Sequence, residues 1–483
     1  MHLRSIGVLG ILLAIFGLGI LFLGAAMWTA GMPQWHPRAV KPGGLSALEV
    51  TEDREHQGIL DDIRPPRIES RLPTEPPVDP NAPKPADTKL YNNLLDNLLS
   101  SLHYYYQVPD DAPPTQFVAS WDADTGARVL GDALWVSLEA NLDYLLTLEI
   151  YRRLHAKAVF DQDLVFARKR VEGIFAQDWH TGIEWPLSPY FDLVQLYDLT
   201  GDEQYLQWAE RYALGDGPQD SNSPLSMAKG LAFKFQYSLA RVGSPIYFLY
   251  AALLADYGKR RDPAMINQAR FMFEGLRDLL LDRRYNLLMK QVSVPSDGSS
   301  VRNLTQTFDT LEQVTAIRAV IAYGQASGDP EATSLAKAVM SGIWGTNSIL
   351  LVKPPEDMPP TTFYGVYTAY DLGREAMRMD PNMKTIDQIL LFETEVLLNG
   401  ATRGEYRGDV DFLASWLEDS GPLYKPYLNG YFATYGDNWA DPEDKIISAR
   451  AAIWMARGLA EDEWHKYRTA QAVSGQLARP EAH

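Results

Sequence analysis

The sequence contains no cysteine in 483 residues. Without thiols there is no disulfide bond, thiolate zinc site, cysteine nucleophile or lipoprotein anchor. The eight histidines are scattered, and no two of them have the spacing of metal ligands. The sequence also lacks a P-loop, a dinucleotide-binding glycine fingerprint, a nucleophile elbow and a zinc motif. We therefore predict no metal and no cofactor, and these absences argue against nucleotide-binding, triad-hydrolase and metalloenzyme functions.

Basic residues are scarce beside acidic ones. The chain has 44 lysines and arginines against 62 aspartates and glutamates, a formal net charge of -18. Proteins that bind nucleic acids neutralise phosphates with clustered lysine and arginine, and no such cluster occurs here. We predict that nucleic acid is not a partner.

Charge is absent altogether from residues 6–30. This apolar run is longer than the roughly 7–15 residues of a signal-peptide core and can form a helix of about 20 residues that spans a bilayer. Trp28 and Trp35 fall where an interfacial aromatic belt would lie. We interpret residues 1–32 as a cytoplasmic stub and a transmembrane signal anchor, with the large domain periplasmic or extracellular. Cleavage near residues 24–26 is the alternative.

Residues 33–88 are interpreted as a proline-rich linker. The stretch 72–85 reads Leu-Pro-Thr-Glu-Pro-Pro-Val-Asp-Pro-Asn-Ala-Pro-Lys-Pro and is nearly free of large apolar side chains. Such a segment favours the extended polyproline conformation and cannot build a core. It is expected to hold the domain at 89–470 away from the membrane, or alternatively to serve as a docking ligand for a partner. Residues 471–483 are predicted to be a flexible tail.

Five short turns that contain aspartate separate helix-like segments within residues 89–470. They lie at 161–163, 201–202, 262–263, 328–330 and 380–381. In each turn an aspartate occupies the expected N-cap position, and in three of them proline follows at the first helical position. The segment before each turn is apolar and rich in aromatics, whereas the segment after it carries more charge. This pattern predicts a series of helical hairpins.

We predict six hairpins, each with an inner helix that is apolar on most faces and an amphipathic outer helix. The first five pair residues 132–153 with 163–176, 188–199 with 203–213, 244–257 with 264–281, 309–326 with 331–343, and 363–379 with 383–398. The sixth pairs 444–458 with a helix after 460, or with the helix near 90–106, which would close a ring. Extra helical pieces are expected at 227–239 and 410–416.

The predicted fold class is therefore all-α, an (α/α)6 toroid of helical hairpins with a small β-hairpin insertion near 287–294. It is preceded by the transmembrane helix and the proline-rich linker. Tandem hairpins can also stack into an open solenoid, which is the alternative. Uneven hairpin spacing and little shared sequence between hairpins favour the toroid.

The connections between hairpins are long, and in a toroid they emerge on one face, above the N-termini of the inner helices. Long loops on a rigid scaffold are where binding residues concentrate. These connections are rich in carboxylates and aromatics. The candidate catalytic residues are Asp122, Asp124, Glu184, Asp309 and Glu312. The candidate substrate-binding residues are Trp121, Trp185, Tyr190, Tyr435, Asp437 and Trp439.

Such loops suit sugar chemistry. Aromatic rings stack on the apolar faces of pyranoses, and two carboxyl groups on opposite sides of a glycosidic bond can act as general acid and base. Glu184 follows Ile183, in a setting whose apolar character would raise the pKa of a general acid.

Each candidate also has a structural explanation. An Asp-x-Asp sequence before glycine is a common turn, which applies to residues 122–126, and Glu184 can be a solvated loop residue. Asp309 and Glu312 have the spacing of a capping box at the start of a helix. The aromatic residues can instead pack within the loops or the core.

The turn at 196–206 reads Leu-Tyr-Asp-Leu-Thr-Gly-Asp-Glu-Gln-Tyr-Leu. With the hairpin series over roughly residues 90–470, it resembles the six-hairpin glycosidase superfamily and its epimerase-like relatives. This resemblance is architectural. It implies carboxylates, or histidine in the epimerase branch, inside a cleft lined with aromatics, and a polysaccharide or oligosaccharide ligand.

Two functional hypotheses follow. The first is a membrane-anchored, extracytoplasmic protein that binds and hydrolyses a cell-envelope or exported polysaccharide, with lyase and epimerase chemistry as other enzymatic options. The second is a non-catalytic scaffold or glycan-binding subunit of an envelope assembly, with envelope proteins as partners. Aromatic and acidic loops favour the first, and the absence of a clear catalytic signature favours the second.

Overall fold

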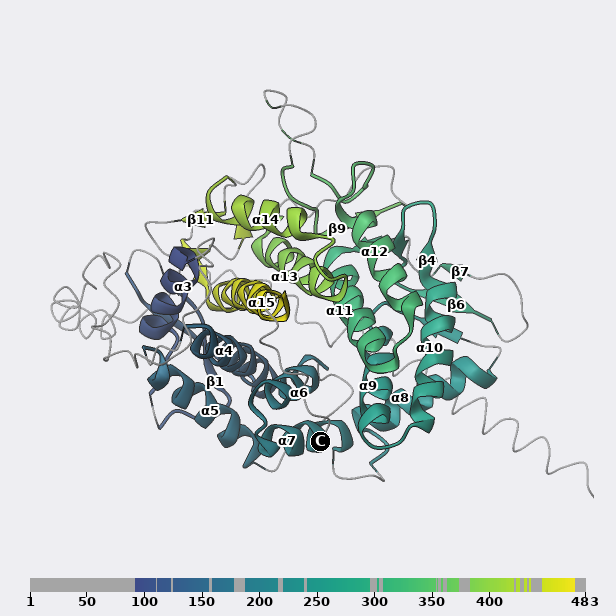
Figure 1. Ribbon diagram of the computed structural model, residues 1–483, viewed down its shortest axis with the longest axis horizontal. Helices are drawn as coiled ribbons and strands as arrows, with labels where there is room; N and C mark the ends of the chain where they lie inside the picture. Colours follow the sequence, from purple (N-terminus) through teal and green to yellow (C-terminus); the bar gives the residue numbers. More distant parts are fainter. Residues whose placement is uncertain are drawn as a thin grey trace, which may run out of the picture. The chain divides into compact units, whose positions relative to one another are not determined.

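The structure of the protein is a computed structural model (Figure 1). It describes residues 92–473 except for 110, 123–124, 156–158, 178–186, 216–219, 239–240, 296–301, 304–306, 353, 355–357, 359–362, 373–382, 421–422, 426–429, 432–433 and 436–444. The predicted anchor, the linker and most of the predicted tail lie outside these residues. No helix in the part that the structure describes is long and apolar enough to cross a membrane.

Helices dominate the described residues and form two concentric layers (Figure 1). The inner layer contains α4 (Leu134–His155), α6 (Ser188–Thr200), α9 (Tyr247–Arg260), α11 (Thr310–Ser327), α13 (Thr385–Ala401) and α15 (Ala449–Val473). The outer layer contains α3 (Asn92–Tyr105), α5 (Asp161–Phe175), α7 (Glu203–Leu214), α10 (Ala264–Leu280), α12 (Pro330–Trp344) and α14 (Arg407–Ser415). An additional helix, α8 (Pro224–Tyr237), packs on α9 and α10.

The ring of inner helices is closed. The last inner helix, α15, packs against both α4 and α13, and α3 covers α15 from outside. Between α6 and α9, the Tyr190 hydroxyl donates a hydrogen bond to Asp256 Oδ2 at 2.7 Å. An open solenoid would leave its first and last hairpins apart, so the toroid prediction is confirmed.

Short strands gather at the N-terminal ends of the inner helices. The strand β2 (Arg128–Asp132) leads into α4, β8 (Thr307–Asp309) into α11, and β14 (Ile446–Ser448) into α15. A three-stranded sheet has the order β14-β1-β2, with β1 (Gln116–Asp122) antiparallel to both neighbours. A second has the order β3-β6-β7, with β6 (Val292–Val294) paired to both β3 (Arg241–Gly243) and β7 (Arg302–Asn303). We call this end of the ring the loop face.

Smaller strand pairs complete the loop face and its surroundings. They are β8 with β9 (Ala369–Asp371), β10 (Met383–Lys384) with β13 (Thr434–Tyr435), β4 (Leu281–Asp282) with β5 (Leu287–Leu288), and β11 (Tyr424–Lys425) with β12 (Gly430–Tyr431). The predicted β-hairpin exists, but it is β6 with β7. Leu287–Leu288 belongs to a separate pair with β4, so the expected extent of the hairpin was wrong.

Two of the predicted aspartate N-caps are confirmed: Asp202 and Asp329 each accept a hydrogen bond at 3.0 Å from the backbone N–H two residues later. Asp262 accepts from Ala264 N at 3.1 Å, but it precedes the N-cap of α10, which is Pro263. The turn at 161–163 differs, because Asp161 is already the first residue of α5 and the N-cap Phe160 has no side-chain hydrogen bond. The turn at 380–381 lies outside the described residues.

The fifth predicted hairpin was wrong. Residues 363–372 are not an inner helix; they contain a bridge from Val366 to Leu351 and the strand β9. Gly365 has a φ of +102°, in the region that favours glycine and is incompatible with a helix. The inner helix is instead α13, which was predicted to be outer, and its outer partner is α14 followed by a π-helical turn at Trp416–Ser420.

The sixth hairpin follows the second of its two predicted forms. The helix α15 continues without a break through residue 460 to Val473 and pairs with α3 from the start of the domain. The ring closes because α15, the last described helix, packs against α3, the first described helix. The predicted extra helices at 227–239 and 410–416 correspond to α8 and to α14, the latter being a regular outer member of the ring.

Candidate functional site

The loop face carries a cluster of two carboxyl groups and a lysine at the start of α11. Asp309 ends β8 and is the N-cap of α11, where its Oδ1 accepts a hydrogen bond from the N–H of Glu312 at 3.1 Å. Lys290 Nζ lies 3.4 Å from Asp309 Oδ2 and 3.5 Å from Glu312 Oε1. We call Lys290, Asp309 and Glu312 the acid cluster.

The capping box predicted for this position is only half made. In a complete box the Glu312 side chain would accept a hydrogen bond from the backbone of Asp309. Instead, Glu312 Oε1 faces Lys290, and Glu312 Oε2 is buried with no hydrogen-bond partner among the described residues. Burial raises the pKa of the Glu312 carboxyl to about 7, with Lys290 opposing the rise and Asp309 adding to it. Glu312 is therefore suited to hold and release a proton near neutral pH.

The starts of α11 and α13 repeat one sequence pattern, Thr-Leu-Glu-Gln at 310–313 and Thr-Ile-Asp-Gln at 385–388. The two glutamines have the same function. Gln313 accepts from Leu288 N at 2.8 Å and donates to Leu288 O at 2.7 Å, and Gln388 forms the same two bonds with Val366 at 2.9 and 2.7 Å. We call each such pair of hydrogen bonds a clamp. One clamp fixes Leu288 of β5 and the other fixes the bridge at Val366, so the carboxylate before each glutamine has a defined position.

In this repeat, Asp387 is the counterpart of Glu312. Its Oδ2 accepts a hydrogen bond from the Thr368 hydroxyl at 2.7 Å, and the carbonyl of Thr368 accepts from the N–H of Thr310 at 2.9 Å. One threonine therefore connects the starts of the two helices. The acid cluster is held on a rigid support, as a catalytic group requires.

A second charged cluster lies across the ring, at the starts of α4, α6 and α15. Glu139 Oε1 accepts a hydrogen bond from the Ser188 hydroxyl at 2.6 Å, and Arg450 pairs with Glu139 Oε2. The Arg450 guanidinium lies over the Trp454 ring, 4.2 Å from its centroid. Arg450 is the most exposed of these side chains, so a cation on an aromatic support faces solvent here.

Beneath these clusters, the centre of the ring is filled by buried charges from five inner helices. Arg457 pairs with Asp143, with Asp192 at 2.8 Å, with Glu461 at 3.2 Å and with Glu393 at 3.3 Å. Glu393 also pairs with Arg318 at 2.9 Å. We call these six residues the central charge cluster: Asp143, Asp192, Arg318, Glu393, Arg457 and Glu461.

The central charge cluster contains four carboxyl groups and two guanidinium groups. Full ionisation would leave buried negative charge without compensation, which is costly in a low-dielectric interior. Burial accordingly raises the pKa of Asp192 to about 8 and that of Glu393 to about 7, with Arg457 opposing both rises. These two groups hold protons at mildly acidic pH.

This arrangement predicts that stability falls as pH rises. The Asp192 carboxyl, usually near 3.8, stays protonated in the folded chain up to a pKa of about 8, so the stability that its proton supplies is complete below 3.8 and is lost as pH rises through 8. The thermal midpoint of the wild type should drop by several degrees between pH 5 and pH 9. Asp192→Asn should flatten this slope, and parallel slopes for the two proteins would refute the assignment.

The structure places the predicted site residues in different settings. Trp121 is 2% exposed and stacks on Tyr105 with ring centroids 5.1 Å apart, and Tyr190 is 2% exposed. Both rings pack within the protein, which corrects the expectation that they are open to a sugar. Asp122 Oδ1 accepts hydrogen bonds from the N–H and hydroxyl of Thr125 at 2.7 and 2.9 Å, as the turn explanation requires.

Two of the predicted catalytic residues, Asp309 and Glu312, lie together in the acid cluster. Tyr435 lies in β13, paired with Met383 immediately before α13. Asp124, Glu184, Trp185, Asp437 and Trp439 lie outside the described residues.

Sequence reasoning missed Lys290, Asp387 and Glu139. The repeated Thr-x-acid-Gln pattern could have revealed Asp387, because the same four positions open two inner helices. Lys290 and Glu139 carry no such signal. Lys290 belongs to an irregular connection. Glu139 lies inside a helix whose apolar character suggested only a role in the core.

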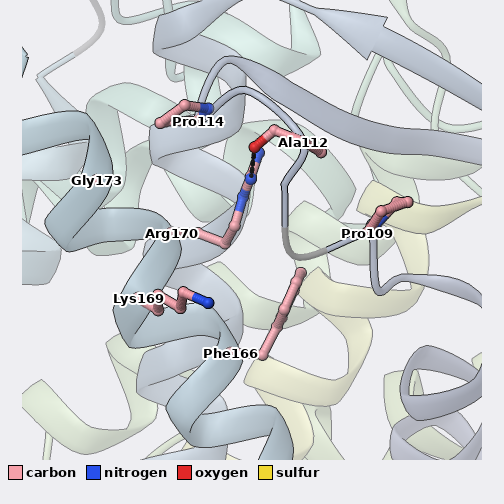
Figure 2. Close-up of a pocket in the computed structure, with 7 residues that line it drawn as sticks. All are labelled: Pro109, Ala112, Pro114, Phe166, Lys169, Arg170 and Gly173. Atoms are coloured by element: carbon pink, nitrogen blue, oxygen red, sulfur yellow. Dashed lines mark hydrogen bonds between the residues drawn. The ribbon is translucent and has the colours of Figure 1, made fainter.

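A separate cavity of about 280 Å³ lies between α5 and the connection that follows α3 (Figure 2). Its lining includes Phe166, Lys169 and Arg170 from α5. Arg170 donates to the carbonyls of Ala112 at 2.9 Å and Pro113 at 2.5 Å, so it fastens this connection to the outer helix. The described lining contains no carboxylate, and we attribute a structural role to this region.

Known structures share the ring of hairpins. An inactive variant of the α-1,6-mannanase of Salegentibacter sp. HEL1_6, in complex with α-1,6-mannotetrose, is 16% identical, with 78% of this chain and 99% of that chain covered and a TM-score of 0.50. The unsaturated glucuronyl hydrolase specific for heparin is 12% identical, with 78% and 97% covered and a TM-score of 0.50. A sugar epimerase from a ruminal bacterium is 9% identical, with 78% and 98% covered and a TM-score of 0.51.

No protein-family model and no curated protein matches the sequence. The likeness to solved structures spans nearly their whole length, at identities that carry the fold and not the activity. The described helices agree with it, since six inner helices close into a ring with their N-termini at the loop face. The chain therefore has the six-hairpin glycosidase-like (α/α)6 toroid fold.

Proposed function

We propose that the loop face binds a polysaccharide and hydrolyses it, with Glu312 as the general acid. The observation that carries this proposal is the state of Glu312: 13% exposed as a side chain, with one unpartnered oxygen and a pKa raised to about 7. A carboxylic acid that is about half protonated near pH 7, on a side chain that is not fully enclosed, is suited to donate a proton in glycosidic cleavage. The carbohydrate-active enzymes that share this fold support a carbohydrate substrate by analogy.

In the proposed reaction, Glu312 transfers its proton to the glycosidic oxygen while the bond from that oxygen to the anomeric carbon breaks. A water molecule adds to the anomeric carbon and gives its proton to a second carboxylate, so the products are two sugar chains with one molecule of water incorporated. We assign the second role to Asp309, which Lys290 and the first turn of α11 hold in place. The raised pKa of Glu312 beside Asp309 divides the acid and base roles between the two groups.

The sequence adds a proposal about location. The uncharged run at 6–30 would anchor the chain in a membrane, and the proline-rich linker would hold the toroid outside the cytoplasm, near an envelope or exported glycan. The full chain should then sediment with membranes, resist carbonate extraction and be digested by protease added to intact spheroplasts. Recovery of the full chain in the soluble fraction would refute the membrane anchor. Protection of the toroid from protease would refute the proposed orientation of the anchor.

A second candidate function is a scaffold or glycan-binding subunit of an envelope assembly. The observation that favours it is the filled centre of the ring, where Arg457 is 4% exposed and Glu393 is 0% exposed as side chains. A scaffold needs rigidity at this position, whereas an enzyme also needs a cleft above it.

A glycan panel distinguishes the two candidates. The full chain in detergent would be incubated with neutral and acidic polysaccharides, and binding and the release of new reducing ends would be measured in parallel. Release that requires active protein supports the hydrolase. Binding without release supports the glycan-binding subunit, and neither binding nor release across the panel would contradict a carbohydrate function and leave the scaffold.

A further inference from the structure

A second cavity, of about 600 Å³, lies at the opposite end of the ring from the loop face. It is formed where α13 ends, along the turn into α14, and beside the last turns of α15. Fourteen residues of α13 separate its start from Asn399, which corresponds to about 20 Å at 1.5 Å per residue. The lining residues are Asn399, Gly400, Arg403, Gly404, Arg407, His465, Lys466, Thr469 and Ala470.

The charge of this lining is opposite to that of the chain. Its described members include two arginines and a lysine, but no carboxylate. The whole chain has a formal net charge of -18. A basic cavity on an acidic protein cannot be explained by overall composition, and it attracts anions locally.

Two of the cations are held in position from behind. Asp462, whose side chain is 0% exposed, lies 3.0 Å from Arg407 Nη2 and 2.9 Å from Lys466 Nζ. Asp411, whose side chain is 38% exposed, also pairs with Arg407 and lies 3.8 Å from Lys466 Nζ. The buried Asp462 and the exposed Asp411 together fix the two cations at the cavity before any ligand arrives.

Arg403 supplies a third cation. Its backbone φ is +57°, a left-handed conformation that is strained for a residue with a side chain, and Gly404 follows with φ +97°. Its guanidinium is exposed and has no hydrogen bond or ion pair among the described residues. Strain of this kind persists where the surrounding structure imposes it, and here it places an uncompensated guanidinium at the cavity.

Uncharged polar groups complete the lining. The His465 ring packs against α13 where Gly400 has no side chain; a Cβ there would lie 2.7 Å from the ring. Burial lowers the pKa of His465, so the imidazole is neutral at pH 7 and can accept as well as donate a hydrogen bond. Asn399 uses its Oδ1 for Tyr406 N at 3.1 Å, which leaves its Nδ2 as a donor.

We propose that this cavity binds a sugar-sized molecule that carries a phosphate monoester. Arg403 and Arg407 can contact the phosphate oxygens, and the Lys466 ammonium, which is buried against Asp462, adds positive charge behind them. The cavity is within the range of about 300–1,000 Å³ typical of small-molecule sites and has room for an organic part beyond the phosphate. Asn399, His465 and Thr469 supply hydrogen bonds to hydroxyl groups of that part. The site is separate from the acid cluster and does not depend on the proposed hydrolysis.

Calorimetry on the full chain in detergent tests this proposal with glucose 6-phosphate, glucose and inorganic phosphate, and with vesicles that contain phosphatidic acid. Glucose 6-phosphate should bind at one site and glucose should not. Arg403→Gln should weaken binding about tenfold or more, since a hydrogen bond to a charged group is lost. Lys466→Gln should act in the same direction. Arg153→Gln is the matched control, because Arg153 is an exposed arginine in the last turn of α4, at the same end of the ring.

Binding of vesicles alone, abolished by Arg403→Gln, would support the phosphate monoester and identify a lipid headgroup as its source. No binding of any phosphate compound would overturn the proposal. Equal binding by the wild type, Arg403→Gln and Lys466→Gln would overturn it as well, because the anion would then sit elsewhere. Reducing-end release from the glycan panel should be unaffected by Arg403→Gln, so failure here and failure of the proposed hydrolysis are distinguishable.

Discussion

Replacing Glu312 by glutamine is expected to lower the rate of glycan hydrolysis by about 10²- to 10⁴-fold, the usual contribution of a general acid. The amide keeps the size of the side chain and its position at the third residue of α11, but it has no proton to transfer. Substrate binding should change little, because the loop-face scaffold is untouched. The measurement is kcat and KM for reducing-end release on whichever polysaccharide of the panel is hydrolysed.

The matched control is Glu331→Gln on the outer helix α12, where the carboxylate is 64% exposed and away from the loop face. This variant should retain the wild-type rate. A loss shared by both variants, or a Glu312→Gln protein that hydrolyses at the wild-type rate, would remove Glu312 from the mechanism.

The pH dependence gives an independent check on the same residue. Activity should fall above pH 7, where the Glu312 carboxyl loses its proton. Lys290 lowers the pKa of Glu312, so Lys290→Met should move this fall to higher pH. A fall in activity that stays in place in Lys290→Met would contradict the assignment.

Replacing Arg457 by methionine is expected to produce the largest loss of stability in the molecule, about 3–5 kcal/mol. The guanidinium is 4% exposed and pairs with four carboxyl groups from α4, α6, α13 and α15. Its removal would leave those groups buried with Arg318 as the remaining cation of the central charge cluster. Urea unfolding followed by circular dichroism gives the free energy of unfolding.

The comparison variant is Arg168→Met, which removes a surface arginine that is 37% exposed and pairs with Glu172 and Asp202. It should cost no more than about 1 kcal/mol, as exposed ion pairs do. If Arg457→Met does not fold, Arg457→Lys keeps a charge at the centre and should fold with intermediate stability. Equal stability of the Arg457 and Arg168 variants would show that the central cluster does not hold the ring together.

Much of the fold is readable from local sequence signals. Asp202 and Asp329 mark helix starts because a short side chain there satisfies a backbone N–H, and the helices before them are apolar on most faces. The same reasoning failed for the inner helix predicted at 363–379 from its aromatic run, because the described part, 363–372, is not helical. The backbone at Gly365 and the pairing of β9 with β8 determine the structure there, and both are set by tertiary contacts.

The site was less predictable because its parts are distant in sequence. Asp143 and Arg457 are 314 positions apart and meet only because the ring closes. Within its own helix Arg457 has the spacing to pair only with Glu461, four positions later, and no spacing links it to Asp143. Glu312 was identified from its position at a helix start, but its unpartnered oxygen and its burial depend on Lys290 and on the clamp made by Gln313.

The most direct test of a glycan-hydrolysing loop face is a crystal structure of the Glu312→Gln protein with an oligosaccharide of the polysaccharide that the wild type cleaves. The account predicts sugar rings across the N-termini of the inner helices, with one glycosidic oxygen within hydrogen-bond distance of the side chain at position 312 and Asp309 on the other side of that bond. An oligosaccharide bound away from the starts of α11 and α13, or at the opposite end of the ring, would contradict it.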